Sequence, residues 1–310
     1  MATTTTTNQS GSSRALVNQQ EVEKKLSSRL TKNKVLKWVF FACTLIGLIV
    51  LAALLIDTLI KGVPYLKPSF FTNFSSSMPS MAGIKGALVG TLWLMITIIP
   101  ISIILGVGTA IYLEEYAKDN AFTSFVKISI SNLAGVPSVV FGLLGLTIFV
   151  RGMGIESLSL GKSVIAAALT MSLLILPVII VSSQEAIRAV PKSVREASYG
   201  LGGNKWQTIY KIVLPAALPG ILTGFILSLS RALGETAPLI LIGIPTILLR
   251  LPTGIFDMFQ AMPIQIYNWA KMPQEAFQHV ASAGIIVLLV LLLAMNGLAI
   301  FLRNKFSKKY

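Results

Sequence analysis

The sequence predicts an all-α membrane protein with six transmembrane helices, and three observations favour this fold class. Hydrophobic residues make up 54% of the 310 residues and charged residues only 12%, with a mean hydropathy of +0.76. Such a chain is too apolar and too sparsely charged for a soluble domain of this length. Six long runs carry almost no charge, and the basic residues gather in alternate connecting segments. Together these features are typical of a polytopic membrane protein.

Six apolar runs are expected to form the membrane-spanning helices. They cover residues 38–60, 86–113, 128–150, 163–183, 212–230 and 280–302, and only the first contains a charged residue, Asp57. Each approaches or exceeds the roughly 20 residues that a helix needs to cross a hydrocarbon core about 30 Å thick. The first run is longer than the roughly 7 to 15 apolar residues of a signal peptide. We therefore expect helix 38–60 to be retained as an anchor.

The distribution of Lys and Arg predicts the orientation. If the N-terminus is cytoplasmic, 18 of the 26 basic residues lie on the inner side, seven lie outside and Arg231 lies within a span. Because basic residues accumulate on the cytoplasmic side, both termini are expected inside. The same distribution argues against a nucleic-acid partner, since the charge follows the membrane flanks and no basic fold studded with aromatic residues supports it.

The segments outside the helices have simple expected roles. Residues 1–37 form a basic cytoplasmic N-terminus with a Thr-rich start, and the first 20 or so lack the apolar side chains that would offset the entropy of ordering, so disorder is expected. Residues 61–83 form an extracytoplasmic loop rich in Pro, Ser and Phe, and residues 304–310 a short cytoplasmic tail. The five later helices lie within residues 84–303.

No cofactor site is expected. One Cys and one His, Cys43 and His279, leave no disulfide framework and no metal cluster. Gly161-Lys162-Ser163 matches the end of a phosphate-binding P-loop, but the Gly required five positions earlier is replaced by Glu156.

The inside loop 184–215 is predicted to form two short helices. Ser193-Val194-Arg195-Glu196 fits a capping box that would open the first helix, and Gly202-Gly203 would end it. Asn204-Lys205-Trp206-Gln207 is a weaker cap for the second helix, which would run toward Pro215. Two apolar faces are expected, Val194, Ala197 and Leu201 on the first helix and Trp206, Ile209 and Val213 on the second. The pair could fill a groove in another protein, or it could be an ordinary hairpin on the membrane surface.

Arg231 and Glu235 are the only charges deep in a span. Counted from Pro219 near the inner interface, Arg231 lies roughly 18 Å into the bilayer, where an unpartnered Arg costs at least about 2.5 to 3.5 kcal/mol. Glu235 is expected one turn further along the same face, as its partner. One possibility is that the pair has a purely structural role and holds helices together. Alternatively, the Arg231 guanidinium could bind a tetrahedral oxyanion in transit, while Glu235 neutralises the site when it is empty.

The inside loop resembles a known motif. Its Glu196-Ala197-Ser198, Gly202, Ile212 and Leu214-Pro215 are similar to the E-A-A…G…I-x-L-P loop of type I ABC importer permeases, which contacts an ATPase. Ser198 is one departure, since Ala is usual there. The resemblance implies that these residues couple the permease to ATP hydrolysis on a partner subunit.

Two further stretches resemble a narrower family. Arg231–Leu239 and Leu133–Leu143 are similar to the PstA permeases of bacterial phosphate ABC importers, and the likeness covers residues 84–303, implied to be a type I ABC transmembrane domain. It implies a phosphate path at Arg231, Glu235 and Thr236. The implied partners are a PstC-like second permease, a PstB-like ATPase dimer and a PstS-like phosphate-binding protein, in the bacterial plasma membrane. The chain itself would catalyse no bond change.

Two alternatives stay open. A stand-alone secondary transporter or channel could use Arg231 and Glu235 as an ion or proton site. An ABC permease for another oxyanion, such as sulfate, would present the same residues, because the geometry of Arg does not separate the two anions.

Overall fold

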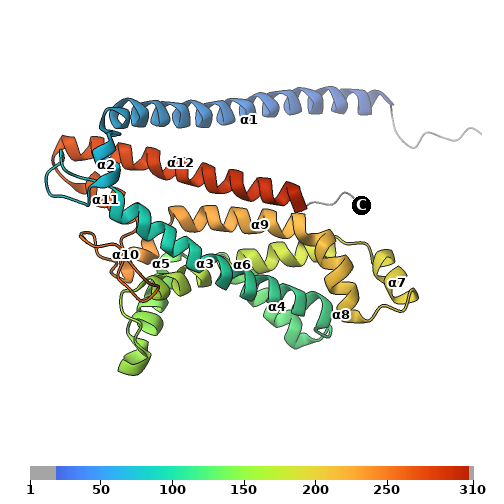
Figure 1. The fold of residues 1–310 in the computed structure, drawn as a ribbon. Helices are drawn as coiled ribbons and strands as arrows, with labels where there is room; N and C mark the ends of the chain where they lie inside the picture. The colour runs from blue at the N-terminus through green and yellow to red at the C-terminus, as the bar shows by residue number, and fades with distance from the viewer. Residues whose placement is uncertain (1–18, 307–310) are drawn as a thin grey trace, which may run out of the picture. The chain divides into compact units, whose positions relative to one another are not determined.

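The computed structural model describes residues 19–306, which are helices joined by turns and loops without a β-strand (Figure 1). The expectation for residues 1–18 and 307–310 lies outside this range. The helices are α1 (Gln19–Gly62), α2 (Pro68–Thr72), α3 (Lys85–Ile111), α4 (Ala121–Leu133), α5 (Ser138–Gly145), α6 (Val164–Arg188), α7 (Lys192–Gly200), α8 (Lys205–Thr208), α9 (Leu214–Gly234), α10 (Ala237–Leu241), α11 (Met262–Lys271) and α12 (Glu275–Phe306).

Five of the predicted spans are confirmed as single helices. In the described part of the chain, α1, α3, α6, α9 and α12 are long and apolar enough to cross a membrane. Helix α1 starts earlier than expected, at Gln19, so residues 19–37 continue the helix. The chain divides into two compact units after Asp57, and the first consists of α1 up to that residue.

The predicted span 128–150 is not one straight helix. Helix α4 ends at Leu133, α5 begins at Ser138, and the two axes are bent by 103°. Pro137 lies at this break and explains it. Pro has no backbone N–H to donate to the preceding turn, and it disfavours the helical conformation at the residue before it. The predicted sixth span is therefore a bent pair of helices, either a broken span or a re-entrant loop, and the all-α fold class with five to six spans is confirmed.

Within residues 58–306, the long helices pack side by side around α6. Figure 1 shows α6 between α3 and α9, and α12 packs against α9 and α11. The largest buried cluster fills the space among α3, α5, α6, α9 and α10. It includes Leu94, Ile98, Met171, Ile175, Phe225 and Leu239. The α6–α9 connection lies outside this core and has a smaller buried cluster of its own.

The segment before α11 is hydrogen-bonded to the N-terminal end of α6. The N–H groups of Val164 and Ile165 donate to the backbone oxygens of Asp257 and Ile255, at 3.0 and 2.8 Å. The carboxylate of Asp257 accepts bonds from the backbone N–H and the hydroxyl of Thr253, both at 2.7 Å, and from the N–H of Gly254 at 3.0 Å. These bonds lower the pKa of Asp257 below its usual 3.8, with the Thr253 hydroxyl as the largest cause.

Candidate functional site

The predicted inside loop forms a helical hairpin, the α7–α8 hairpin (residues 189–213). Helix α6 runs to Arg188, five residues beyond its predicted end, so the connection is shorter than expected. The Ser193–Glu196 capping box is wrong. Helix α7 begins at Lys192, its N-cap is Pro191, and no side chain caps it. Ser193 therefore lies inside the first turn. The fixed φ of Pro191 suits the start of a helix, so the helix begins directly after it, at Lys192.

The turn between the two arms depends on Gly202 and Gly203 for different reasons. Gly202 has φ +83°, a left-handed conformation that side chains other than Gly rarely adopt, and a Cβ there would meet no atom within 4 Å. A Cβ on Gly203 would lie 2.9 Å from both the backbone oxygen and the Oγ of Ser198. A side chain therefore has open space at Gly202 but not at Gly203.

The second arm opens on the cap that seemed weaker in the sequence. Asn204 Oδ1 accepts from the Gln207 N–H at 2.8 Å, and Gln207 Oε1 accepts from the Asn204 N–H at 3.0 Å, which completes a capping box. The arm is not a separate short helix ending near Pro215. Residues 205–234 form one continuous helical stretch through the π-turn η6 (Ile209–Val213), and Leu214 and Pro215 open α9. The hairpin is therefore continuous with the helix that carries Arg231.

The predicted apolar faces are only partly buried. Ile209 and Val213 are buried, but Trp206 is 63% exposed. On α7 the buried residue is Ser198, whereas Ala197 and the neighbouring Leu201 face outward, Leu201 being 91% exposed. Glu196 is also exposed. This chain alone thus leaves an apolar face of α7, with a carboxylate beside it, uncovered.

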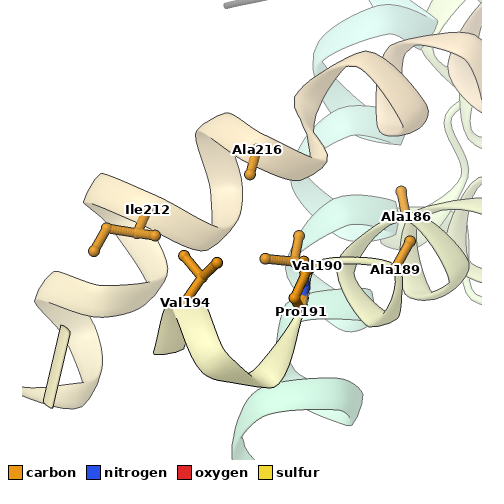
Figure 2. A pocket seen from close by; sticks show the side chains of 7 residues that line it. All are labelled: Ala186, Ala189, Val190, Pro191, Val194, Ile212 and Ala216. Carbon is orange, nitrogen blue, oxygen red and sulfur yellow. The ribbon is translucent and has the colours of Figure 1, made fainter. Parts of the chain in front are cut away.

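A pocket of about 350 Å³ separates the start of α7 from the second arm. Figure 2 shows Val194 pointing across it toward the helix that carries Ile212. The remaining lining consists of Ala186, Ala189, Val190, Pro191 and Ala216. Ile212, one residue of the predicted ATPase motif, therefore lies inside the hairpin and not on its outer face.

Arg231 lies on an uncovered stripe of α9. The exposed side chains Thr223, Leu227 and Arg231 are spaced four residues apart, so they share one face, while the other faces of α9 pack against α6 and α12. The exposed positions of α3, such as Leu92, Ile96 and Ile104, are apolar. A stripe with Arg and Thr does not suit lipid, so it faces protein or water.

The predicted pairing of Arg231 with Glu235 is wrong. Helix α9 ends at Gly234 and Glu235 has an extended backbone (φ −77°, ψ 126°), so it does not follow Arg231 around the same face. No ion pair joins the two side chains in the described chain, and Glu235 and Thr236 are half-buried between α9 and α10. The helix is broken at Glu235. Helix α10 begins two residues later, at Ala237, and has Pro238 in its first turn.

The two PstA-like stretches lie against each other. A Cβ on Gly142 of α5 would lie 2.8 Å from the Cα of Pro238 and 2.8 Å from the Leu241 side chain. The Gly therefore permits the close approach of α5 to α10 directly after the α9 break. Residues about 100 positions apart in the sequence thus build one region.

The π-turn η2 (Tyr112–Tyr116) at the end of α3 holds charged residues that the sequence analysis missed. Glu114 pairs with Lys127 and Arg188, and Glu115 pairs with Arg195. The signal available in the sequence is the Glu114-Glu115 doublet directly after an apolar run, opposite a loop rich in Arg and Lys.

Long apolar helices around a shared core, with a capped hairpin continuous with a charged span, define a membrane transport subunit. The chain belongs to the family of binding-protein-dependent transport system inner membrane components, whose model matches residues 98–308. As a component of an ABC importer, it works with an ATPase and a substrate-binding protein.

Relatives agree with this assignment and confirm the PstA resemblance. The chain is 33% identical to the phosphate transport system permease protein PstA of Yersinia pestis, over 92% of this chain and 94% of the relative. It is 32% identical to the probable ABC transporter permease protein YqgI of Bacillus subtilis, over 91% and 98%. Among solved structures, a bacterial ABC transporter involved in alginate import matches with a TM-score of 0.63 at 18% identity, covering 90% of this chain and 100% of that one. The last comparison supports the fold alone.

Proposed function

We propose that this chain is the permease subunit of an ATP-driven phosphate importer, forming half of the translocation path. The observation that carries the proposal is the continuous helical stretch 205–234, which has the ATPase-type hairpin at one end and an uncovered Arg231 at the other. The PstA relatives, 30 to 35% identical, support phosphate as the substrate.

Arg231 is proposed to contact the anion. Its guanidinium is permanently charged and offers a fork of donors that suits a tetrahedral oxyanion. Glu235 and Thr236 follow at the end of α9 and flank the same region. Because Glu235 does not pair with Arg231 in this chain, the Arg is available to the anion, and the nearby carboxylate keeps binding weak enough for release.

The α7–α8 hairpin is proposed to receive the ATPase. Its outer surface presents Glu196, Ala197 and Leu201, Ser198 and Ile212 lie inside the hairpin, and Leu214 and Pro215 open α9 directly after it. The partners would be a PstC-like permease, a PstB-like ATPase dimer that hydrolyses ATP and a PstS-like binding protein. The hairpin and both termini would then lie in the cytoplasm.

A secondary transporter is the main rival, and the hairpin argues against it, since a carrier without an ATPase has no use for an exposed docking surface. The decisive experiment reconstitutes the chain with its three partners in liposomes and compares phosphate, sulfate and arsenate. We expect phosphate to stimulate ATP hydrolysis and to be taken up, with no stimulation by sulfate. Uptake that persists without the ATPase would instead establish the carrier.

A further inference from the structure

The turn η2 connects α3 to four other helices through three consecutive residues. Glu114 Oε1 lies 3.2 Å from Lys127 Nζ of α4 and 2.8 Å from Arg188 Nη2 of α6. Glu115 Oε1 lies 3.1 Å from Arg195 Nη2 of α7. The ammonium of Lys205 in α8 lies 4.9 Å from the centre of the Tyr116 ring. A π-turn exposes successive residues in different directions, and such turns occur often at functional positions.

Of the basic residues around this turn, Arg195 makes the most hydrogen bonds in the described chain. Its Nη1 donates to the oxygen of Val190 and its Nη2 to that of Ile187, both at 2.8 Å, and Nη2 also donates to Glu115. The guanidinium thus joins the end of α6 and the turn η2 to α7. Only 17% of the Arg195 side chain and 9% of the Glu115 side chain is exposed, and Arg195 Nε is buried without an acceptor. Lys could not replace this planar fork, because it has one nitrogen.

Arg195 and Glu196 are adjacent in α7 but face different surroundings. Glu196 is exposed with the apolar face of α7, while Arg195 is bonded into the end of the bundle. Among the hydrogen bonds of the described chain, Arg195 is thus the α7 side chain that joins this helix to the turn after α3 and to the end of α6.

We propose that Glu115 and Arg195 are the positioning residues that transmit movement of the α7–α8 hairpin to α3. This inference rests on the proposed function, because it takes the ATPase as the source of the movement. The continuous stretch 205–234 moves α9 directly, and the Glu115–Arg195 contact makes α3 follow. Without it, the hairpin would move while α3 stayed behind, and ATP would be hydrolysed with little transport.

Arg188 provides a matched control. It joins the same turn to the same helix end, but 64% of its side chain is exposed, and exposed ionic groups contribute little. Arg188 also makes no bond to a backbone carbonyl in the described chain, in contrast with Arg195. Glu114 is no control, because only 11% of its side chain is exposed and it pairs with both Lys127 and Arg188. Arg195→Lys and Glu115→Gln are therefore compared with Arg188→Lys.

The test uses the complete four-component complex in liposomes and measures phosphate transported per ATP hydrolysed. We expect Arg195→Lys and Glu115→Gln to assemble with wild-type amounts of ATPase and to retain ATP hydrolysis, while transport per ATP falls at least fivefold. Arg188→Lys should stay within twofold of wild type. Wild type that neither recruits an ATPase nor hydrolyses ATP would contradict the proposed function, which separates that failure from failure of the inference.

Three results would overturn the inference itself. One is an unchanged amount of phosphate transported per ATP hydrolysed in both Arg195→Lys and Glu115→Gln. Another is loss of assembly in Arg195→Lys with normal coupling in Glu115→Gln, which would mean that Arg195 only caps α6. The third is loss of assembly in both, which would make the contact a support of the fold and not a transmitter of movement.

Discussion

The Oγ of Ser198 lies 2.8 Å from the Oγ1 of Thr208, and this buried hydroxyl pair joins the two arms of the α7–α8 hairpin. Thr208 donates its own proton to the oxygen of Asn204 at 3.0 Å, so Ser198 is the donor in the pair. The residue that departs from the usual E-A-A pattern thus adds a bond that Ala could not make.

This arrangement predicts unequal effects of two substitutions. Ser198→Ala removes the donor but orphans no other group, so we expect a loss of about 1 kcal/mol or less, with transport intact. Thr208→Val should cost more, because it leaves the Ser198 hydroxyl buried without its acceptor. Thermal unfolding of the purified complex measures both. A larger loss for Ser198→Ala would contradict the assigned direction of the bond.

The two glycines of the turn should respond differently. Gly203→Ala forces a Cβ against the backbone of Ser198 and should destabilise the subunit itself. The Asp side chain of Gly202→Asp meets open space, and Asp is one of the few residues other than Gly that adopt a left-handed backbone. The subunit should therefore still insert and fold. We expect Gly202→Asp to weaken copurification of the ATPase and to abolish uptake. Normal transport by this variant would exclude Gly202 from the ATPase contact.

Replacement of Arg231 tests the anion path. A hydrogen bond to a charged group contributes about 1.5 to 3 kcal/mol, so Arg231→Gln should lower phosphate uptake at least about tenfold while the complex still assembles. Leu227→Gln, one turn earlier on the same stripe, adds an amide without removing a charge and should retain uptake. Because Arg231 and Glu235 are not paired, adding Glu235→Gln should restore nothing. Wild-type uptake by the double variant would refute the substrate role.

Cysteine labelling tests the orientation. Cys43 is the only native thiol, so its replacement by Ala gives a clean background. Leu201→Cys, at a 91% exposed position of the hairpin, should react from the cytoplasmic side, and Leu158→Cys, at a 56% exposed position between α5 and α6, from the outside. Neither substitution removes the neighbouring Asn204 cap or the hydrogen bond from Ser159 to Val150, so the fold should be retained. The reverse pattern would invert the topology.

The lowered pKa of Asp257 predicts a pH effect at the N-terminal end of α6. Its folded pKa is lowered, so its stabilising bonds to Thr253 and Gly254 are fully present above the ordinary value of 3.8 and are lost as the pH falls through the lower folded value. Asp257→Asn lacks the charge at every pH. We expect wild type to have the higher unfolding temperature near neutral pH and the difference to shrink below the ordinary pKa. A difference that grows on acidification would contradict this.

Much of the fold follows from one-dimensional patterns. The spans that became α3, α6, α9 and α12 were predictable because apolar length decides whether a helix can cross a bilayer. The Asn204 cap was predictable because it is a local bond among four residues. The Ser193 cap failed for a related reason: two local signals competed there, and Pro191 set the helix start.

The sequence by itself determined the fold class, because an apolar, sparsely charged chain with repeated long apolar runs has few stable folds. It also determined the family, because the family motifs lie in short stretches of the sequence. Only the tertiary structure decided which residues act together. The end of α9 at Gly234 separated Arg231 from Glu235, close packing at Gly142 brought the two PstA-like stretches together, and the η2 turn placed Glu115 against Arg195, 80 residues away. Such contacts depend on how helices pack in space, and no local pattern of residues encodes them.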